Sequence, residues 1–457
     1  MSLWPVDFIN QIKKLDVDAN AFINALDNDA ATAIRLNPFK KNSHISFLQN
    51  SHQVPWCSLG YILNQRPQFT ADPLFAAGAY YVQEISSMFL CHVVNYLKQT
   101  YDIKKALDLC AAPGGKTTIL QSVLPKNSMI IANEIIKSRV STLVQNIQKW
   151  GLANTIVTNN SSEDFLELID FFDLVLVDAP CSGEGLFRKQ PKAAEKWSLE
   201  NVKLCSLRQQ KILHHAINTL KPSGFLIYST CTFNKTENEE IIHFLIKEYG
   251  FSKVTIPIEP NWQIVEIEEA CYRFLPHLTV GEGLFMAIIQ KPGNNFVPDK
   301  KKKNFFHKYN KKAPINVSDF IVNGDNFEIR NKNELLYAIP KNFSNDYDFI
   351  EKNLNMAYAG INLGQLNKNK KLIPHHALAL YTGFKNPFQT IEVDLNEALL
   401  YLRKQQITFK SNLTNGFALL TYKNTPIGFV NIVGNRINNC YPNEWRIIKE
   451  YKADEIS

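Results

Sequence analysis

Two cysteines, one of them close to an aspartate, are the residues of this sequence best suited to covalent catalysis. The apolar run 172–177 leads into DAPC, which begins at Asp178 and ends at Cys181, and the run 224–228 leads into STCT, which contains Cys231. A single cysteine is most often a small buried hydrophobic residue. Thiolates are good nucleophiles, however, and two cysteines that each follow a predicted central strand indicate a shared site.

A second feature with chemical potential is the small-residue turn CAAPGGK at 110–116. It joins a short apolar strand pattern to a helical pattern, and such a corner of a doubly wound sheet lets a ligand approach the backbone and a helix N-terminus. A phosphate-binding loop would need glycine at Cys110, and the G-x-G-x-x-G dinucleotide fingerprint is absent. A third interpretation is the S-adenosylmethionine loop of a Rossmann-like methyltransferase, for which Glu134 stands about 20 residues further on, where an acidic residue binds ribose. An ordinary glycine turn is the structural alternative.

These groups together fit methyl transfer to a cytosine ring. Carbon 5 of cytosine is too electron-poor to take a methyl group directly, so a thiolate must first add to carbon 6 while N3 is protonated. Carbon 5 can then take the methyl group, and loss of its proton allows the thiol to leave. The chemistry needs a thiolate, an acid near N3 and a second group that helps release.

Strand–helix alternation between residues 104 and 291 indicates that a parallel sheet positions these groups. In the doubly wound order the first, fourth and fifth strands are neighbours, about 4.8 Å apart. Their C-terminal ends would bring Asp178, Cys181 and Cys231 beside the 110–116 turn. The expected fold is an α/β, Rossmann-like class I methyltransferase with a mixed, mostly parallel seven-stranded sheet. Six of its strands can be placed in the sequence, at 106–109, 129–133, 156–158, 172–177 and 224–230, with an antiparallel strand at 284–290.

Changes in pattern divide the 457 residues into five regions. A small α+β domain (RRM-like) is expected at 1–74 and the methyltransferase domain at 75–291. A basic linker follows at 292–314, where lysines and aromatic residues interleave; this mixture fits either simple solubility or contact with phosphates and bases. The β-rich regions 315–390 and 391–457 contain no acid/base or metal cluster and are interpreted as binding modules.

Amino-acid composition indicates the cellular compartment and argues against a membrane protein. Hydrophobic residues make up 45% of the chain, the net charge is +7, and eight cysteines are scattered without a C-x-x-C pair. No apolar run reaches the roughly 20 residues that span a bilayer, and the N-terminus lacks the apolar region of a signal peptide. We therefore expect a cytoplasmic protein with reduced thiols, no membrane segment and no metal site.

The chemical motifs resemble those of the Nop/Sun family of RNA 5-methylcytosine methyltransferases. The matching stretches are LDLCAAPGGKTT, VDAPCSGEGLFRK, YSTCTFNKTENE and YRFLPHLTVGEGLFMAIIQK. The resemblance implies that Cys231 is the nucleophile, that Cys181 assists product release and that Asp178 contacts the cytosine. It implies S-adenosyl-L-methionine as the cofactor, with these candidate binding residues: Cys110, Ala111, Ala112, Pro113, Gly114, Gly115, Lys116, Glu134, Asn160, Ser161 and Asp178. At Asn160 and Ser161 the family usually has an acidic residue near the adenine.

The rest of the chain resembles the bacterial RsmF-type 16S ribosomal RNA methyltransferases. The matching stretches are GFVNIVGNRINNCYPNEWRI, GINLGQLNKNKKLIPHHALAL and, near the N-terminus, AIRLNPFK, and no NusB-like helical domain precedes them. The resemblance implies a first RNA-binding domain at 315–390, a PUA-like domain at 391–457, and RNA, expected to be 16S rRNA in the small ribosomal subunit, as the partner of a monomer. Basic residues expected to line the RNA path are Lys116, Arg139, Arg188, Lys189 and Arg273.

Three alternatives keep part of this interpretation. The roles of the two cysteines could be exchanged, with Cys181 as the nucleophile, as in DNA cytosine methyltransferases. The substrate could be transfer RNA, which leaves the chemistry unchanged. The protein could also be a catalytically inactive RNA-binding ribosome-assembly factor, although the cofactor loop and both cysteines that the chemistry needs are present.

Overall fold

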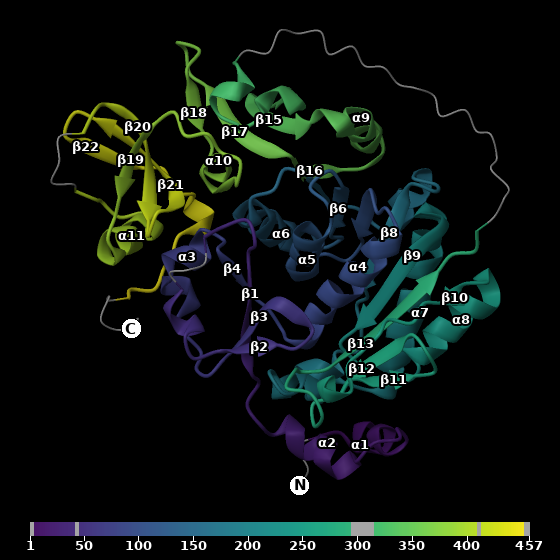
Figure 1. Ribbon diagram of the computed structural model, residues 1–457. Helices are drawn as coiled ribbons and strands as arrows, with labels where there is room; N and C mark the ends of the chain where they lie inside the picture. Colours follow the sequence, from purple (N-terminus) through teal and green to yellow (C-terminus); the bar gives the residue numbers. More distant parts are fainter. Residues whose placement is uncertain (1–3, 42–44, 294–314, 409–412, 452–457) are drawn as a thin grey trace.

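A ten-stranded mixed sheet forms the centre of the computed structural model, which describes residues 4–41, 45–293, 315–408 and 413–451 (Figure 1). Five parallel strands in the order β9-β8-β5-β6-β7 form its middle, and β13 pairs antiparallel with β9, as expected. The α/β, Rossmann-like fold is therefore confirmed. These strands are β5 (Lys105–Asp108), β6 (Met129–Asn133), β7 (Thr155–Thr158), β8 (Phe172–Asp178), β9 (Leu220–Thr230) and β13 (Leu284–Gln290).

The sheet is wider than the seven strands expected. Strands β11 (Val265–Ile267) and β12 (Cys271–Phe274) extend one edge beyond β13, with which β10 (Ser252–Lys253) also pairs. At the other edge, β16 (Met356–Ala359) pairs antiparallel with β7, although almost 200 residues separate the two strands. Short edge strands carry little periodicity of their own, so the pattern did not reveal them.

Helices cover both faces of the sheet because successive strand residues point to opposite sides. In β5, Ala106 belongs to the apolar core beneath α4 and α5, whereas Leu107 belongs to the core beneath α7 and α8. The interior of β8 is fully buried on both faces, and each such side chain contributes about 1.5–3 kcal/mol. The helices are α4 (Phe89–Thr100), α5 (Gly115–Val123), α6 (Lys137–Trp150), α7 (Leu199–Thr219) and α8 (Glu239–Tyr249).

The N-terminal region forms a second sheet with strand order β2-β3-β1-β4. Its fourth strand comes from residues after 74, the expected boundary, so this sheet continues into the next region of the sequence. The first two helices instead pack beside the loops that follow β8 and β9, where Phe8 contacts Phe187 and Phe22 contacts Phe233. The elements are α1 (Val6–Lys13), α2 (Ala19–Leu26), β1 (Thr32–Leu36), β2 (His52–Val54), β3 (Cys57–Leu63), α3 (Pro73–Ala76) and β4 (Tyr80–Val82).

The C-terminal region contains two four-stranded sheets, seen side by side in Figure 1 with α10 between them. The first has the order β14-β15-β17-β18 and the second β19-β20-β21-β22. Their elements are β14 (Phe327–Lys332), β15 (Leu335–Pro340), α9 (Ser344–Asn353), β17 (Ile361–Leu366), β18 (Leu372–Pro374), α10 (His376–Leu380), β19 (Gln389–Glu392), α11 (Leu395–Leu402), β20 (Gly416–Tyr422), β21 (Thr425–Val433) and β22 (Arg436–Asn439).

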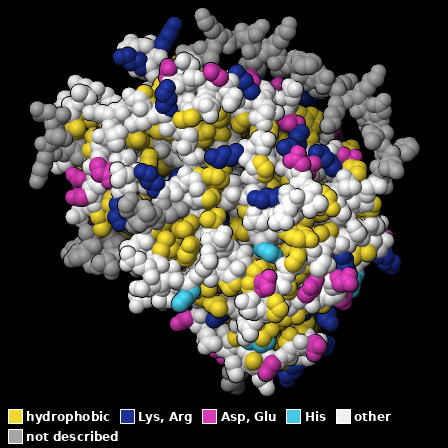
Figure 2. All heavy atoms as spheres, in the orientation of Figure 1, with side chains coloured by type: hydrophobic (Ala, Val, Ile, Leu, Met, Phe, Trp, Pro, Cys, Tyr) yellow, Lys and Arg dark blue, Asp and Glu magenta, His cyan; other side chains and the backbone are white. Residues whose placement is uncertain are grey.

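Charge is unevenly distributed over the face in Figure 2. Acidic side chains are scattered over the lower part of the view, with a few basic ones among them, whereas lysines and arginines prevail around its centre. The lysine-rich part of the expected linker, at 294–314, lies outside the described residues. Among the helices of the described ranges, none is long and apolar enough to cross a membrane.

Candidate active site

The sheet brings the chemical residues together at the C-terminal ends of three adjacent strands. Asp108 ends β5, Asp178 ends β8, and Cys231 directly follows β9. In the pairing of β8 with β9, Asp178 lies opposite Ser229, whose hydroxyl donates a 2.7 Å hydrogen bond to its carboxylate. The sulfurs of Cys181 and Cys231 are 3.2 Å apart. The convergence inferred from the strand order is therefore present in the fold.

The glycine-rich turn packs tightly between β5 and α5. Gly114 has a φ of +110°, which side chains rarely permit, and a Cβ atom on Gly115 would lie 3.2 Å from the Tyr81 ring. Asp108 is fully buried beneath the turn and accepts a 2.6 Å hydrogen bond from Thr117. Burial raises the pKa of Asp108 to about 7. Its Oδ1 atom has no hydrogen-bond partner in the described part of the chain.

Lys116 and Asp178 form an ion pair at the mouth of this turn, with 2.7 Å between Nζ and Oδ2. Burial lowers the pKa of Lys116, but the Asp178 carboxylate outweighs that effect, so the pKa of the ammonium is raised overall. Lys116 therefore keeps its positive charge. The carboxylate of Asp178 is fixed from two sides, by Lys116 and by Ser229.

A cleft of about 420 Å³ opens between the turn and the two cysteine loops. The predicted site residues that line it are Cys110, Ala111, Ala112, Pro113, Gly115, Lys116, Asp178 and Cys231. Cys181 is not among the lining residues, although its sulfur lies 3.2 Å from that of Cys231. The hydrogen bond to Cys231 and burial together raise the pKa of the Cys181 thiol well above its usual value.

Four predicted cofactor residues lie outside this lining: Gly114, which is within the turn itself, and Glu134, Asn160 and Ser161. Glu134 is buried, pairs with Arg139 at 3.2 Å and accepts a hydrogen bond from the Ile136 amide. The Asn160 side chain donates to Asp164 at 3.2 Å, and its oxygen accepts a hydrogen bond from the Asn355 amide.

The backbone N–H of Ser161, the neighbouring predicted residue, also donates to Asp164, at 2.8 Å. Asp164 is therefore the acidic group of this loop, and sequence reasoning did not single it out.

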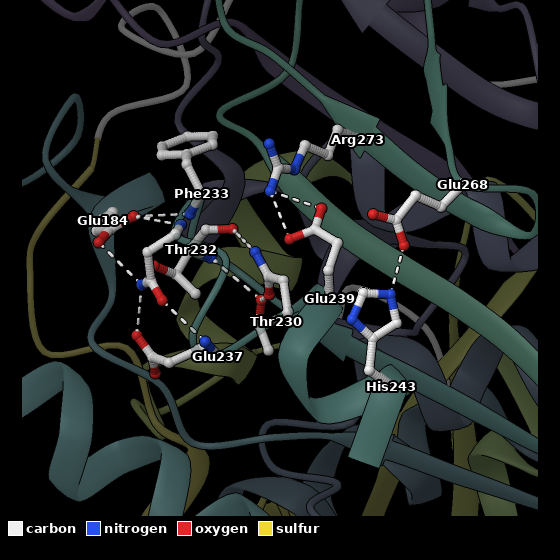
Figure 3. A network of polar contacts seen from close by, with 11 residues as sticks. Glu184, Thr230, Thr232, Phe233, Glu237, Glu239, His243, Glu268 and Arg273 are labelled. Carbon is white, nitrogen blue, oxygen red and sulfur yellow. Dashed lines mark hydrogen bonds and ion pairs between the residues drawn. The ribbon is translucent and has the colours of Figure 1, made fainter. Parts of the chain in front are cut away.

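Two buried glutamates that the sequence analysis missed hold the cysteine loops together (Figure 3). Glu184, from the first loop, accepts hydrogen bonds from the backbone N–H groups of Phe233 and Asn234 in the second, at 2.7 and 3.2 Å. Glu237, which follows the second loop, accepts from the Ser182 amide in the first at 2.9 Å. The bracing is reciprocal, and burial raises the pKa of Glu237.

Other contacts reinforce this bracing. The Asn234 side chain donates to both glutamates, at 3.0 and 2.7 Å. Gly185 donates a 2.7 Å hydrogen bond to the Cys231 carbonyl, and a Cβ atom at this glycine would lie only 2.8 Å from that oxygen. The cysteine spacing therefore depends on residues that lie within the matched motifs VDAPCSGEG and YSTCTFNKTENE, which were the signal available in the sequence.

Another carboxylate that the sequence analysis did not predict also lines the cleft. Glu84 comes from the N-terminal region and accepts hydrogen bonds from the backbone of Ser86, Ser87 and Glu282 at 2.7–3.0 Å. Burial raises its pKa. No local pattern connects residue 84 with the motifs more than 20 residues later, so only the fold reveals it.

The basic residues expected along an RNA path differ in their position and in their partners. Lys116 and Lys189 line the cleft, and Lys189 pairs with Glu282 at 2.6 Å. Arg188 donates to backbone carbonyls, including that of Asn28. The expectation for Arg273 is wrong, because its side chain is only 4% exposed and is paired with a buried glutamate.

Comparisons with known proteins agree with this arrangement. The family model "16S rRNA methyltransferase RsmB/F" matches residues 96–290, the N-terminal domain of 16S rRNA methyltransferase RsmF matches 4–85, and the methyltransferase RsmF PUA domain matches 388–447. Ribosomal RNA small subunit methyltransferase F of Aliivibrio salmonicida (strain LFI1238) is 30% identical over 96% of this chain and 97% of its own length. The chain belongs to the ribosomal RNA small subunit methyltransferase F family. The protein of the same name from Aliivibrio fischeri (strain MJ11) is 31% identical over the same shares.

Solved structures resemble part of the chain. A methyltransferase homolog protein from Pyrococcus horikoshii is 26% identical, with a TM-score of 0.54 over 63% of this chain and 95% of that one. NSun6 from Pyrococcus horikoshii with SFG shares the fold, with a TM-score of 0.54 and 21% identity over 64% of this chain and all of that one.

The chain is thus an RNA methyltransferase with a C-terminal PUA domain, and S-adenosyl-L-methionine is its cofactor. The cleft fits this cofactor, because its glycine turn leaves the backbone accessible and its walls carry carboxylates that can accept from hydroxyl and amino groups. The free Oδ1 of Asp108 beneath the turn is a further acceptor.

Proposed function

We propose that this enzyme methylates carbon 5 of a cytosine in 16S rRNA through a covalent adduct with Cys231. One observation carries the proposal: Cys231 and Asp178 line the same cleft as the glycine-rich turn. Cys181 is absent from that lining, which favours Cys231 as the attacking thiol over the exchanged roles. The turn at 110–116, with Glu134 and Asp108 behind it, would hold the cofactor, which supplies an electrophilic methyl group.

The residues of the site can carry the reaction in order. The two sulfurs are 3.2 Å apart and the pKa of Cys181 is raised, so in this mechanism Cys181 keeps its proton and donates a hydrogen bond to the attacking Cys231 sulfur. As Sγ of Cys231 adds to carbon 6, the proton that leaves the Cys231 thiol is taken up at N3, and the ion-paired Asp178 carboxylate accepts a hydrogen bond from that N3–H. After carbon 5 has gained the methyl group, water takes its proton and the bond between sulfur and carbon 6 breaks. Cys181 gives its proton to the departing Cys231 sulfur and regains one from N3.

The target base must be unpaired or flipped out to enter a cleft of this size. We propose that the enzyme acts as a monomer in the cytoplasm on the small ribosomal subunit, and that the regions 315–390 and 391–457 bind RNA. We also propose that Asn160 and Ser161 contact the adenine of the cofactor. Asp164 is the carboxylate that accepts a hydrogen bond from each of them.

Bisulfite sequencing of total RNA tests substrate and nucleophile together. Cells that lack the gene should lose one methylated cytosine of 16S rRNA; wild-type protein should restore it, and Cys231→Ala should not. The Cys181→Ala variant should instead accumulate an RNA adduct that survives denaturing gels. If the lost signal is in transfer RNA instead, the proposed substrate is wrong. If an adduct forms with Cys231→Ala but not with Cys181→Ala, Cys181 is the nucleophile and the two roles are exchanged.

A further inference from the structure

Two adjoining cavities form a second hollow, which lies away from the active site. Their volumes are about 740 and 470 Å³, and they meet at Tyr381 and Thr382, directly after α10. We call this hollow the rear groove. Cavities of this size are in the range of roughly 300–1,000 Å³ that is usual for ligand sites.

The rear groove lies at the N-terminal ends of the parallel strands of the central sheet, whereas the active site lies at their C-terminal ends. Lys126 and Asn127 line it just before β6 begins, and Asn154 lines it just before β7. The active-site cleft lies beyond the C-terminal ends of the parallel strands. A five-residue strand spans about 16 Å, so one ligand the size of a nucleotide cannot fill both sites.

The charge of the rear groove differs from that of the active-site cleft. The cleft is lined by Glu84, Asp178 and Glu282, whereas no Asp or Glu is among the described residues that line either cavity of the groove. The exposed ammonium groups of Lys126 and Lys341 belong to the groove. A hollow with cations and without carboxylates favours an anion.

Two acidic residues lie nearby and are held outside this lining. Asp325 accepts a hydrogen bond from Ser318 at 3.2 Å. Glu392 accepts from the hydroxyl of Thr421 at 2.6 Å and from the backbone of Asn424 at 3.1 Å. These hydrogen bonds direct both carboxylates to neighbouring protein groups rather than into the groove.

The remaining groups of the groove suit bases as well as phosphates. The rings of Phe327 and Tyr381 meet edge to face, with centroids 6.4 Å apart. The Lys126 ammonium lies 4.9 Å from the Phe39 ring. Asn154 is 4% exposed and donates to the Ser128 carbonyl at 2.9 Å, while its own Oδ1 has no partner in the described part of the chain. An unpaired amide oxygen can accept from a base amino group or a 2′-hydroxyl.

We propose that the rear groove binds a single-stranded segment of the RNA substrate, at a contact remote from the target cytosine. Lysines for phosphates, aromatic rings for stacking and amides for base edges are the combination that single-stranded RNA requires. This inference rests on the proposed action on RNA. The groove is lined from the N-terminal region, the methyltransferase domain and both C-terminal sheets, so an RNA strand bound there contacts every part of the protein at once.

The salt dependence of binding tests the proposal with the full-length protein and small ribosomal subunits from cells that lack the gene. Each phosphate contact to a single strand contributes roughly 0.7 to the slope of log K against log salt concentration. The double variant Lys126→Gln/Lys341→Gln should therefore lower that slope by about 1.4 and raise KM several-fold, with kcat unchanged. The matched control Lys203→Gln/Lys247→Gln, which removes two exposed charges from α7 and α8, should leave slope and KM at wild-type values.

Photo-crosslinking of the same complex locates the contact. We expect RNA crosslinks at Phe327 or Tyr381, and their loss in the double variant. The proposal that the rear groove binds RNA would be refuted by an unchanged salt-dependence slope together with crosslinks elsewhere in the protein. Crosslinks from the groove to a ribosomal protein alone would refute it as well. A wild-type protein that fails to methylate any RNA would contradict the proposed function instead, so the two failures are distinguishable.

Discussion

Replacing Glu237 by glutamine should slow methyl transfer although the residue does not line the cleft. Its Oε1 accepts from the Ser182 amide and the Gln209 side chain, both at 2.9 Å, and Oε2 accepts from Asn234 at 2.7 Å. Glutamine keeps one acceptor and turns the other into a donor. In one orientation the Ser182 amide loses its acceptor, and in the other the new N–H group faces the Asn234 side chain, which is itself a donor. The expected loss of unfolding free energy is about 1–3 kcal/mol.

The larger effect should be on the reaction rate. Glu237 fixes the residue next to Cys181, and the two thiols are only 3.2 Å apart. A misplacement of about 1 Å can cost roughly 10²-fold in rate. We therefore expect a single-turnover methylation rate about 10- to 100-fold below wild type. The KM for RNA should stay within about twofold of wild type, because Glu237 is not among the residues that line the cleft.

Glu239→Gln is the matched control, as Figure 3 shows. Glu239 is also buried and lies two residues away, but it binds Arg273 instead of a cysteine loop. Losing one member of a buried pair costs about 3–5 kcal/mol, so this variant should be less stable yet methylate at nearly the wild-type rate when folded. A folded Glu237→Gln enzyme with the wild-type rate, or an equal loss of rate in both variants, would refute the positioning role.

Three further variants probe the cleft. Lys116→Met should lower kcat/KM at least tenfold in steady-state assays, because Asp178 loses its charged partner. Gly185→Ala should abolish adduct formation on denaturing gels, since the new Cβ would lie 2.8 Å from the Cys231 carbonyl. The raised pKa of Asp108, about 7, gives stability that is present at acid pH and lost as pH rises towards 7, roughly 4 kcal/mol in all; denaturant titrations of Asp108→Asn should show a flatter pH dependence than wild type.

Sequence alone predicted the strand order and the convergence of the cysteines, because both follow from local patterns. Apolar runs and helical periodicity mark each strand and helix, and parallel strands place their C-terminal ends at one edge. That is why Asp178 and Cys231 could be placed together before any contact was known. The resemblance to a known family then assigned chemical roles that spacing alone left open.

The parts that could not be predicted depend on long-range packing. Glu184 and Glu237 look like ordinary charged loop residues in the sequence, yet the fold buries both between the cysteine loops. Arg273 was misjudged for the same reason, since a lone arginine is usually solvent-exposed. Asn160 was placed on the correct loop, but its hydrogen bond with the Asn355 amide depends on a segment 195 residues away.

The pairing of β16 with β7 has a consequence for how this protein is made. While the chain is being synthesised, β7 has no neighbour on its outer side until residues 356–359 have left the ribosome. Its free N–H and C=O groups form an open edge, of the kind that recruits other strands and promotes aggregation. The last strand of the central sheet therefore comes from the C-terminal region of the chain. Translation that stalls before residue 356 should leave a nascent methyltransferase domain that depends on chaperones.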